Sequence, residues 1–273
     1  ILKQSRPWVA KYPDIPAPVE RIDVEGEFIT TVRKEPTLAK FTPKPRGYYA
    51  RDYVLLMEDV TDAEDLSYCY AEDRMIPNAV LRDMLTYLSA LHRLPGRDFP
   101  ENIALRELNH AHIFDLPFRA DNGFPLDDLF PGLAGIAKPL QHDKKLRAAA
   151  AELGNTYLGT RGRALIHGDF YPGSMLDKSN RLYVIDGEFA FRGFPEFDLG
   201  VLLAHLMLAK APAEQLKMLD ANYEKGPGFD AKLVRRFAYV EIIRRLIGIA
   251  QLPLSLTLEE RQGLLEQARR GLI

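Results

Sequence analysis

The stretch "LIHGDFYPGSML" (residues 165–176) places a histidine, a glycine and an aspartate directly after a short apolar segment. A Pro-Gly turn follows, and Ser174 stands five residues after Asp169. A second block, "VIDGEFAFRGFPEFDLG" (184–200), contains Asp186 and, two residues later, Glu188. These two blocks carry the clearest chemical pattern of the chain, and the rest of the sequence is interpreted around them.

Two short apolar segments, 164–166 and 181–186, flank the first block and are predicted to be strands. Their spacing is that of a hairpin, so Asp169 and Asp186 are expected to meet at one end of it. Alternate residues of an extended segment share a face, so Asp186 and Glu188 could ligate one cation through oxygen atoms. Magnesium prefers such a site, with few carboxylates plus phosphate and water.

The order of these residues is similar to that in protein kinases. There, a His-Arg-Asp loop is followed five residues later by an asparagine, and a downstream aspartate binds the metal. Asp169, Ser174 and Asp186 stand in the same order, with Gly168 in place of the arginine. By this order, Asp169 accepts the proton of a substrate hydroxyl. Ser174 reaches a metal, and Asp186 binds magnesium on the nucleotide phosphates.

His-Gly-Asp followed by Ile-Asp and Asp-Leu-Gly resembles the aminoglycoside phosphotransferase and choline kinase superfamily over residues 165–200. These are small-molecule kinases with a protein-kinase-like fold, so the resemblance implies ATP and Mg²⁺ as cofactors. Within the superfamily, the chain looks most like the 5-methylthioribose kinases. That likeness rests on Ser174, on 184–200, on "EIIRRLIGIA" (241–250) and on "ILKQSRPWV" (1–9). Tyr171 and Gly187 depart from the pattern, which has histidine and proline there.

The resemblance implies further roles on the nucleotide side. Lys3 corresponds to the strand lysine that contacts the nucleotide phosphates, in a segment whose glycine-rich phosphate loop is expected upstream. Glu25 best matches the helix glutamate that pairs with this lysine, and Glu20 and Glu27 are nearby alternatives. The hinge segment, whose backbone groups would bind adenine, comprises Met57, Glu58, Asp59 and Val60.

Two arginines are the candidates on the acceptor side. Arg244 and Arg245 are adjacent on a predicted helix, about 100° apart around its axis. The resemblance implies that at least one faces the cleft and holds the sugar or the transferred phosphoryl group, for which guanidinium is well suited. The alternative is a surface helix, because Arg235 and Arg236 repeat the pair on the same helix.

Structural support for the loop is predicted from His167 and Asp198. His167 follows a buried strand and is expected to brace the loop through hydrogen bonds. Asp198 either supports the catalytic loop, as the resemblance implies, or caps the helix that follows it. His92 in "LSALHRL" is predicted to be a helix-packing residue rather than a base.

The predicted fold class is α+β, with two lobes of the protein-kinase type. Residues 1–60 are predicted to form a small strand-rich nucleotide-binding lobe with a hinge, and this lobe is expected to be incomplete at its N-terminus. Within it, the sequence predicts a strand at 53–60, helical spacing over 17–32 and a turn at 44–49. Residues 61–273 form a mainly helical lobe with the catalytic loop and acceptor site. Helices are predicted at 76–96, 143–158, 198–209, 213–223, 231–250 and 257–272, the last with a Thr257/Glu260 capping box. Residues 97–143 receive no assignment.

Composition narrows the classes of function. The 273 residues carry a net charge of −2, and the basic residues are dispersed, so no nucleic-acid partner is expected. No uncharged apolar run is long enough for a membrane span, and no secretory leader is visible. A single cysteine, Cys69, fits a reducing compartment, so a cytoplasmic location is expected. The expected partner is a small-molecule acceptor, and a homodimer is left open.

Two other functions compete with a sugar kinase. The stretch "RADNGFPLDDLF" (119–130) contains Asp121, Asp127 and Asp128, which could line an acidic pocket for a cationic amine such as an aminoglycoside or choline. A nucleotide-binding module without catalysis is the other, because Ser174 departs from the usual catalytic loop. A serine oxygen can still ligate magnesium or bond the loop, so this departure does not disable the site.

Overall fold

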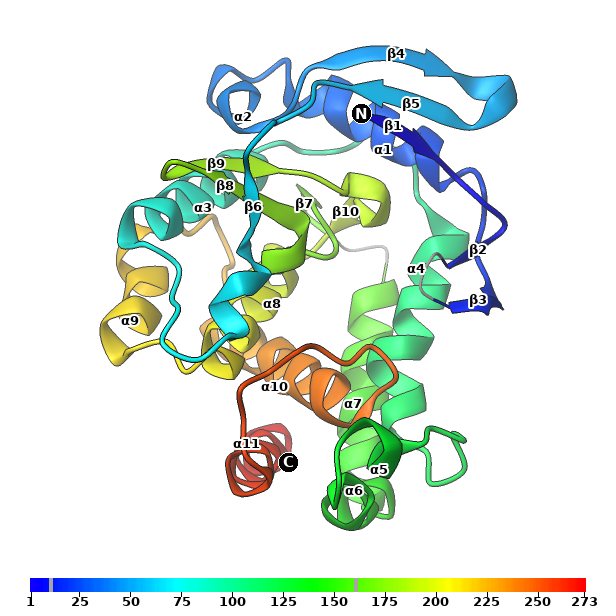
Figure 1. The fold of residues 1–273 in the computed structure, drawn as a ribbon, viewed down its shortest axis with the longest axis vertical. Helices are drawn as coiled ribbons and strands as arrows, with labels where there is room; N and C mark the ends of the chain where they lie inside the picture. The colour runs from blue at the N-terminus through cyan, green and yellow to red at the C-terminus, as the bar shows by residue number, and fades with distance from the viewer. Residues whose placement is uncertain (10–11, 160–161) are drawn as a thin grey trace.

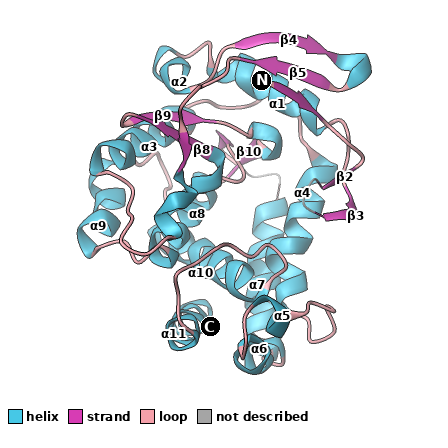
Figure 2. Ribbon diagram, viewed as in Figure 1, coloured by secondary structure: helices cyan, strands magenta, loops and turns pink. Residues whose placement is uncertain are grey.

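The computed structural model of the protein describes residues 1–9, 12–159 and 162–273. At one end lies an antiparallel three-stranded sheet in the order β1-β5-β4, formed by β1 (Leu2–Gln4), β5 (Val54–Met57) and β4 (Pro45–Tyr49) (Figure 1). Helices α1 (Arg21–Val32) and α2 (Pro36–Phe41) accompany it. An antiparallel pair of strands, β2 (Trp8–Val9) and β3 (Tyr12–Pro16), lies beside it. The rest of the chain is mainly helical, as Figure 2 shows.

Helix α1 connects the sheet to the helical body because it is apolar on two faces. Ile22 and Ile29 pack on Leu55 of the sheet and form a small separate cluster. Phe28 and Val32 instead join the large core of the helical body. The predicted helical spacing over 17–32 is therefore confirmed, and Gly26 lies within the helix without ending it.

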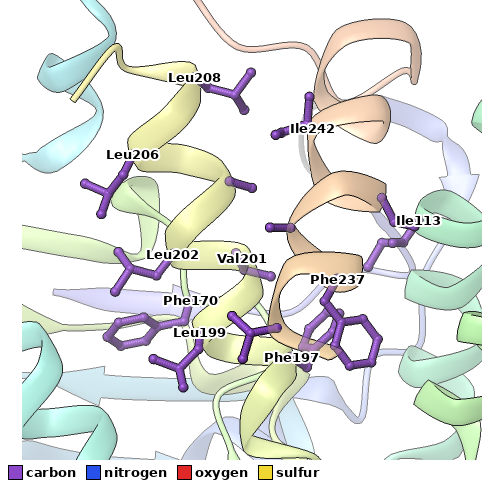
Figure 3. Packing of buried hydrophobic residues seen from close by; sticks show 14 of the residues in the cluster. Ile113, Phe170, Phe197, Leu199, Val201, Leu202, Leu206, Leu208, Phe237 and Ile242 are labelled. Carbon is purple, nitrogen blue, oxygen red and sulfur yellow. The ribbon is translucent and has the colours of Figure 1, made fainter. Parts of the chain in front are cut away.

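The helical body is built around two long helices, α8 (Pro195–Leu208) and α10 (Ala231–Ile247). Figure 3 shows Val201 of α8 and Ile242 of α10 between the two helices, whereas Leu202 and Leu206 lie on the opposite side of α8. A helix that is apolar all round has to be buried, and nearly every residue of α8 is. Around this pair lie α3 (Asn78–Leu91), α7 (Lys144–Leu158), α9 (Ala213–Asn222) and α11 (Leu258–Leu272), close to the predicted ranges. The capping box of Thr257 and Glu260 is confirmed.

The strands of the helical body pair differently from the prediction. Strand β7 (Ala164–Ile166) pairs with β10 (Phe191–Gly193), and β9 (Arg181–Val184) pairs with β8 (Met175–Lys178), which β6 (Glu64–Asp65) joins. The predicted hairpin of 164–166 with 181–186 is therefore wrong. Ser179 and Asn180 both have positive φ, 53° and 63°, which is the geometry of a two-residue hairpin turn. That turn joins β8 directly to β9.

Two further segments differ from the sequence analysis. Residues 44–49 were predicted as a turn, but Pro45–Tyr49 forms strand β4, whose register shifts between Pro45 and Gly47. The unassigned stretch 97–143 contains α4 (Ile103–His110), a π-helical turn η3 (Ala111–Asp115), α5 (Leu126–Leu129) and α6 (Leu133–Gln141). Within the described residues, no helix combines the length and the apolar content needed to cross a membrane.

Candidate active site

A cleft with a volume of about 480 Å³ lies where the sheet, α1, α4 and the loop after β7 come together. Residues distant in the sequence meet in it. The predicted site residues on its wall are Lys3, Asp169, Ser174, Asp186, Glu188 and Arg245. The structure therefore brings Asp169 and Asp186 together although the hairpin predicted to do so does not form.

Lys3 is the centre of an ion-pair cluster on the sheet side of the cleft. Its Nζ lies 2.7 Å from Glu25 Oε2 and 2.6 Å from Asp186 Oδ1, with Glu188 Oε2 at 3.9 Å. Among the three glutamates considered for this pair, it is Glu25 that contacts the lysine. Glu25 is only 1% exposed, and burial raises its pKa to about 7 although Lys3 opposes the shift. Burial works against the charge on Lys3, yet the carboxylates of Glu25 and Asp186 raise the pKa of the lysine.

Asp186 and Glu188 fit a cation that is shared with a nucleotide. Among the described residues, no group of three or more His, Cys, Asp and Glu side chains is arranged to hold a metal by itself. Magnesium is usually bound by one or two carboxylates together with substrate phosphates, and Asp186 and Glu188 supply two carboxylates on the wall of the cleft. The Ser174 hydroxyl donates to the Asp169 carbonyl oxygen at 2.9 Å, so its oxygen lone pairs stay available for ligation.

The backbone at Asp186 is held in an unusual conformation. Its φ is 60°, in the left-handed region that is uncommon for non-glycine residues, although aspartate adopts it more readily than most. The next residue, Gly187, packs so closely under α1 that a Cβ would lie 2.2 Å from Phe28 Cδ1. A larger residue does not fit there unless the Phe28 ring moves.

Asp198 braces the loop that carries Asp169. Its side chain is fully buried, and it accepts hydrogen bonds from the backbone N–H groups of His167 at 2.7 Å and Gly168 at 3.0 Å. Because α8 begins at Pro195, Asp198 lies inside the helix, and the alternative that it caps this helix is wrong. Nε2 of His92 lies 3.1 Å from Asp198 Oδ2, so this packing residue also belongs to the support.

His167 connects the Asp169 loop to the segment before Asp186. Its Nε2 lies 2.9 Å from the carbonyl oxygen of Ile185. The edges of its ring contact Phe28 of α1 and Phe170 of the loop itself. These contacts fix the distance between the two segments that carry the aspartates, which is a structural role.

Both predicted arginines lie beside Asp169. Asp169 Oδ1 is 3.5 Å from Arg245 Nη2 and 3.8 Å from Arg244 Nη1. The two arginines are 5% and 7% exposed, so the surface-helix alternative is wrong for this pair. Burial raises the pKa of Asp169, and the two guanidinium groups oppose this shift.

The hinge segment offers fewer backbone donors than the sequence suggested. The N–H of Met57 donates to the Ile1 carbonyl at 3.0 Å, and that of Glu58 donates to the Lys44 carbonyl at 2.8 Å. The Val60 carbonyl accepts from the Ala63 N–H at 3.2 Å. An adenine contact here must therefore use other backbone groups of the segment 57–60.

The acidic stretch 119–130 does not line this cleft. Asp121, Asp127 and Asp128 are exposed, and Asp127 Oδ1 accepts from the Ala134 N–H at 2.8 Å, close to the start of α6. The acidic acceptor pocket predicted from these three residues is absent from the described part of the cleft.

Three residues of the site were not singled out from the sequence. Arg21 lines the cleft with its Nε 3.4 Å from Glu188 Oε2, and nothing in the sequence pattern indicates it. Tyr171 also lines the cleft, and the guanidinium carbon of Arg245 lies 4.6 Å from its ring centroid. Glu241 precedes the two arginines by three and four residues on α10, the spacing of ion pairs on a helix. This spacing could have identified Glu241 from the sequence as a partner of the two arginines.

Glu241 belongs to a buried polar chain behind the arginines. Its Oε1 lies 3.1 Å from Nε2 of His205, whose Nδ1 lies 2.5 Å from the Tyr70 hydroxyl. Burial lowers the pKa of His205 to about 4, although the carboxylate of Glu241 opposes this. His205 is therefore neutral in the folded protein at neutral pH.

This neutral histidine predicts a pH-dependent stability. Between about pH 6.5 and 4 the unfolded chain binds a proton that folded His205 does not, so the free energy of unfolding falls as the pH falls. The expected contribution is about 3 kcal/mol. Urea denaturation at several pH values gives the free energy of unfolding as a function of pH. Between about pH 6.5 and 4 this free energy should fall less steeply for His205→Gln than for wild type. The exposed His142 supplies the control, His142→Gln, and equal slopes in all three proteins would contradict the assignment.

The sequence is similar to a known protein family and to several curated proteins. A sequence model described as the phosphotransferase enzyme family matches residues 1–233. A methylthioribose kinase of Yersinia pseudotuberculosis is 27% identical over 220 residues, 76% of this chain and 53% of that protein. A methylthioribose kinase of Exiguobacterium sibiricum is 33% identical over 138 residues, 48% of this chain and 35% of that protein. The chain thus spans about half, or less, of the length of these curated relatives.

Solved structures share the fold at low sequence identity. An AMP-bound spectinomycin phosphotransferase has a TM-score of 0.53 and 11% identity, covering 92% of this chain and 83% of that chain. A choline/ethanolamine kinase family protein of Mesorhizobium loti has a TM-score of 0.50 and 16% identity, covering 94% of this chain and 81% of that chain. These likenesses confirm the predicted α+β class and its kinase-like fold.

Proposed function

Because the chain belongs to the phosphotransferase enzyme family, we propose that it transfers the γ-phosphoryl group of ATP to a hydroxyl of a small sugar such as 5-methylthioribose. The observation that carries this proposal is the meeting of Asp169, the Lys3–Glu25 pair and two carboxylates in one cleft. Enzymes of this reaction class act mainly by positioning the reactants and neutralising charge.

The nucleotide is placed on the sheet side of the cleft. Lys3, held by Glu25, contacts the α and β phosphates, and backbone groups of the hinge contact adenine. Asp186, Glu188 and Ser174 would hold magnesium together with the phosphate oxygens. When bound, magnesium supplies positive charge that stabilises the phosphates.

The acceptor is placed on the opposite side of Asp169. The Asp169 carboxylate orients the acceptor hydroxyl and takes its proton as the hydroxyl oxygen bonds to the γ-phosphorus. The bond between that phosphorus and the β–γ bridging oxygen of ATP breaks at the same time, and ADP leaves. Arg244 and Arg245 hold the sugar or the transferred phosphoryl group, for which a guanidinium fork is well matched. Both are already within 4 Å of Asp169 Oδ1, at 3.8 and 3.5 Å.

The lining of the cleft supports a sugar that carries an apolar group. Leu105 and Leu108 of α4 and Leu252 after α10 line the same cleft as Arg245 and Tyr171. A cationic amine would instead need carboxylates beyond Asp169, Asp186 and Glu188, which are assigned to the hydroxyl and to magnesium, and the acidic residues of 119–130 do not line the cleft. The methylthioribose kinases among the relatives agree with this choice.

A panel of acceptors tests the proposal. ADP formation by the full-length protein is measured with 5-methylthioribose, choline and an aminoglycoside at equal concentrations. Turnover with the sugar and none with the two amines supports the proposal. Turnover with an amine alone would replace the sugar by a cationic acceptor. Nucleotide binding with no turnover on any acceptor would favour a module without catalysis.

Asp186→Asn is expected to weaken magnesium binding, so that the reaction needs a higher magnesium concentration. The substitution removes one of the two proposed anionic ligands, Asp186 and Glu188, so more magnesium is needed for half-maximal rate. We expect the required concentration to rise about 10- to 100-fold, as for other changes at metal sites. A magnesium titration of initial rates measures this, with Asp220→Asn on the exposed face of α9 as the control. An unchanged titration would contradict the role of Asp186.

A further inference from the structure

Glu241 is the hub of a buried network directly behind the two arginines. It is 1% exposed, and its carboxylate accepts from Arg245 Nε at 2.6 Å and from Arg244 Nη1 at 3.1 Å. Its Oε1 also faces Nε2 of His205 at 3.1 Å. One carboxylate thus contacts both guanidinium groups and a histidine from the neighbouring helix α8.

The direction of the hydrogen bonds in this network follows from charge. The two guanidinium groups hold the pKa of Glu241 well below its usual range against the effect of burial, so this carboxylate is ionised and can only accept. His205 must then donate from Nε2 to Glu241. As a neutral ring it accepts at Nδ1 from the Tyr70 hydroxyl. Tyr70, His205 and Glu241 therefore form one ordered chain.

Within the described part of the chain, one guanidinium nitrogen of each arginine is left without a hydrogen-bond partner. Among the buried side chains of the described residues, Arg244 Nε and Arg245 Nη2 have no hydrogen-bond partner. Nη2 of Arg245 lies 3.5 Å from Asp169 Oδ1, and Arg245 lines the cleft. A buried donor without a partner is costly, so Nη2 of Arg245, which lines the cleft, is suited to a ligand that supplies oxygen acceptors.

We propose that Glu241, held in turn by His205 and Tyr70, is a positioning residue that fixes Arg244 and Arg245 beside Asp169 at the acceptor end of the cleft. This inference rests on the proposed function of the same site. Without Glu241, two adjacent guanidinium groups would repel each other in a buried environment, and the shared anchor that fixes both would be lost. The arginines would then move away from the acceptor oxygens.

The chain offers a matched control in Glu196. This glutamate is also fully buried, and its Oε1 accepts from Arg163 Nη2 at 2.6 Å and from the Asp230 N–H at 2.9 Å. None of these three residues lines the cleft. Glu196→Gln therefore removes a buried charge paired with arginine, as Glu241→Gln does, but at a distance from the acceptor.

Steady-state kinetics of the full-length protein test the proposal. Glu241→Gln is expected to lower kcat/KM for the acceptor by about 10- to 100-fold, the size of loss seen when residues that orient a functional group are changed. The KM for ATP should stay within about 2-fold of wild type, because Lys3 and its partners are untouched. Glu241→Asp, which keeps the charge, should recover part of the loss. Glu196→Gln should leave all kinetic constants unchanged.

Equal kinetic constants in wild type and Glu241→Gln would overturn the proposal, as would equal losses in Glu241→Gln and Glu196→Gln. If Glu241→Gln does not fold, Tyr70→Phe removes only the last hydrogen bond of the chain. It is expected to raise the acceptor KM by about 2- to 5-fold, in keeping with one buried hydrogen bond. An unchanged acceptor KM in Tyr70→Phe would then overturn the proposal.

A second readout separates this inference from the proposed function. The exchange of the Arg245 Nε–H with solvent, followed by NMR, reports its bond to Glu241 without any turnover. It should be slow in wild type and in Glu196→Gln, and fast in Glu241→Gln. A wild-type protein without turnover on any acceptor rejects the proposed function, whereas fast exchange in wild type rejects the positioning role.

Discussion

Asp169→Asn is expected to reduce phosphoryl transfer by about 10²- to 10⁴-fold, the contribution of a positioned acid–base group. The amide has nearly the same shape as the carboxylate but cannot take the proton of the acceptor hydroxyl. The backbone of the loop should keep its place, because Asp198 holds it through the N–H groups of His167 and Gly168. Nucleotide binding should therefore persist. Initial rates and ATP affinity, measured on the same preparation, check both parts of this expectation.

The control for this variant is Asp177→Asn. Asp177 lies on β8, shortly after Asp169 in the sequence, but outside the cleft, where its Oδ2 contacts the Tyr68 hydroxyl. Asp177→Asn should retain the wild-type rate. Rates within about 3-fold of wild type in Asp169→Asn would show that proton transfer to this carboxylate is not what drives the reaction.

Gly168→Ala is expected to destabilise the folded protein strongly. Gly168 has a φ of +82°, and a Cβ there would lie 2.1 Å from the backbone oxygen of Phe189. The left-handed conformation costs an alanine about 1–2 kcal/mol. A clash with backbone costs about 1–3 kcal/mol more, because the segment after Asp186 has to shift. The total expected loss in the free energy of unfolding is about 2–5 kcal/mol.

Urea denaturation of Gly168→Ala and Gly123→Ala separates these two costs. Gly123 also has a positive φ, +72°, but a Cβ there would meet nothing within 4 Å. Gly123→Ala should therefore lose only about 1–2 kcal/mol, the conformational part. If both variants lost the same amount, the close approach of Gly168 to Phe189 would not contribute. The same close approach explains why this loop has glycine where protein kinases have arginine.

The sequence was most informative where the chemistry is local. His167, Gly168 and Asp169 are adjacent, and Glu188 follows Asp186 by two residues, so their grouping needed no knowledge of long-range contacts. The helices were predictable because their apolar faces repeat over many residues, as in α3 and α7. The Lys3–Glu25 pair was harder, since three glutamates within eight residues fit the pattern and only the packing of α1 selects one.

Strand pairing and the cleft wall were not predictable in the same way. The short strand β7 gives no indication in its own sequence that it pairs with β10 rather than β9. Residues 97–143 are interrupted by prolines and contain short helices, so no sustained period identifies them. Leu105 and Leu108 reach the cleft only through the packing of α4 against distant parts of the chain. Glu241 could have been predicted, because its spacing to the arginines is visible in the sequence.

Phosphorus NMR of a reaction containing the full-length protein, ATP, magnesium and 5-methylthioribose tests the central claim most directly. The account predicts a new phosphomonoester resonance that grows in step with ADP and is absent with Asp169→Asn. Loss of the γ-phosphoryl signal to inorganic phosphate alone, or an ATP spectrum that stays unchanged, would contradict transfer to a sugar hydroxyl.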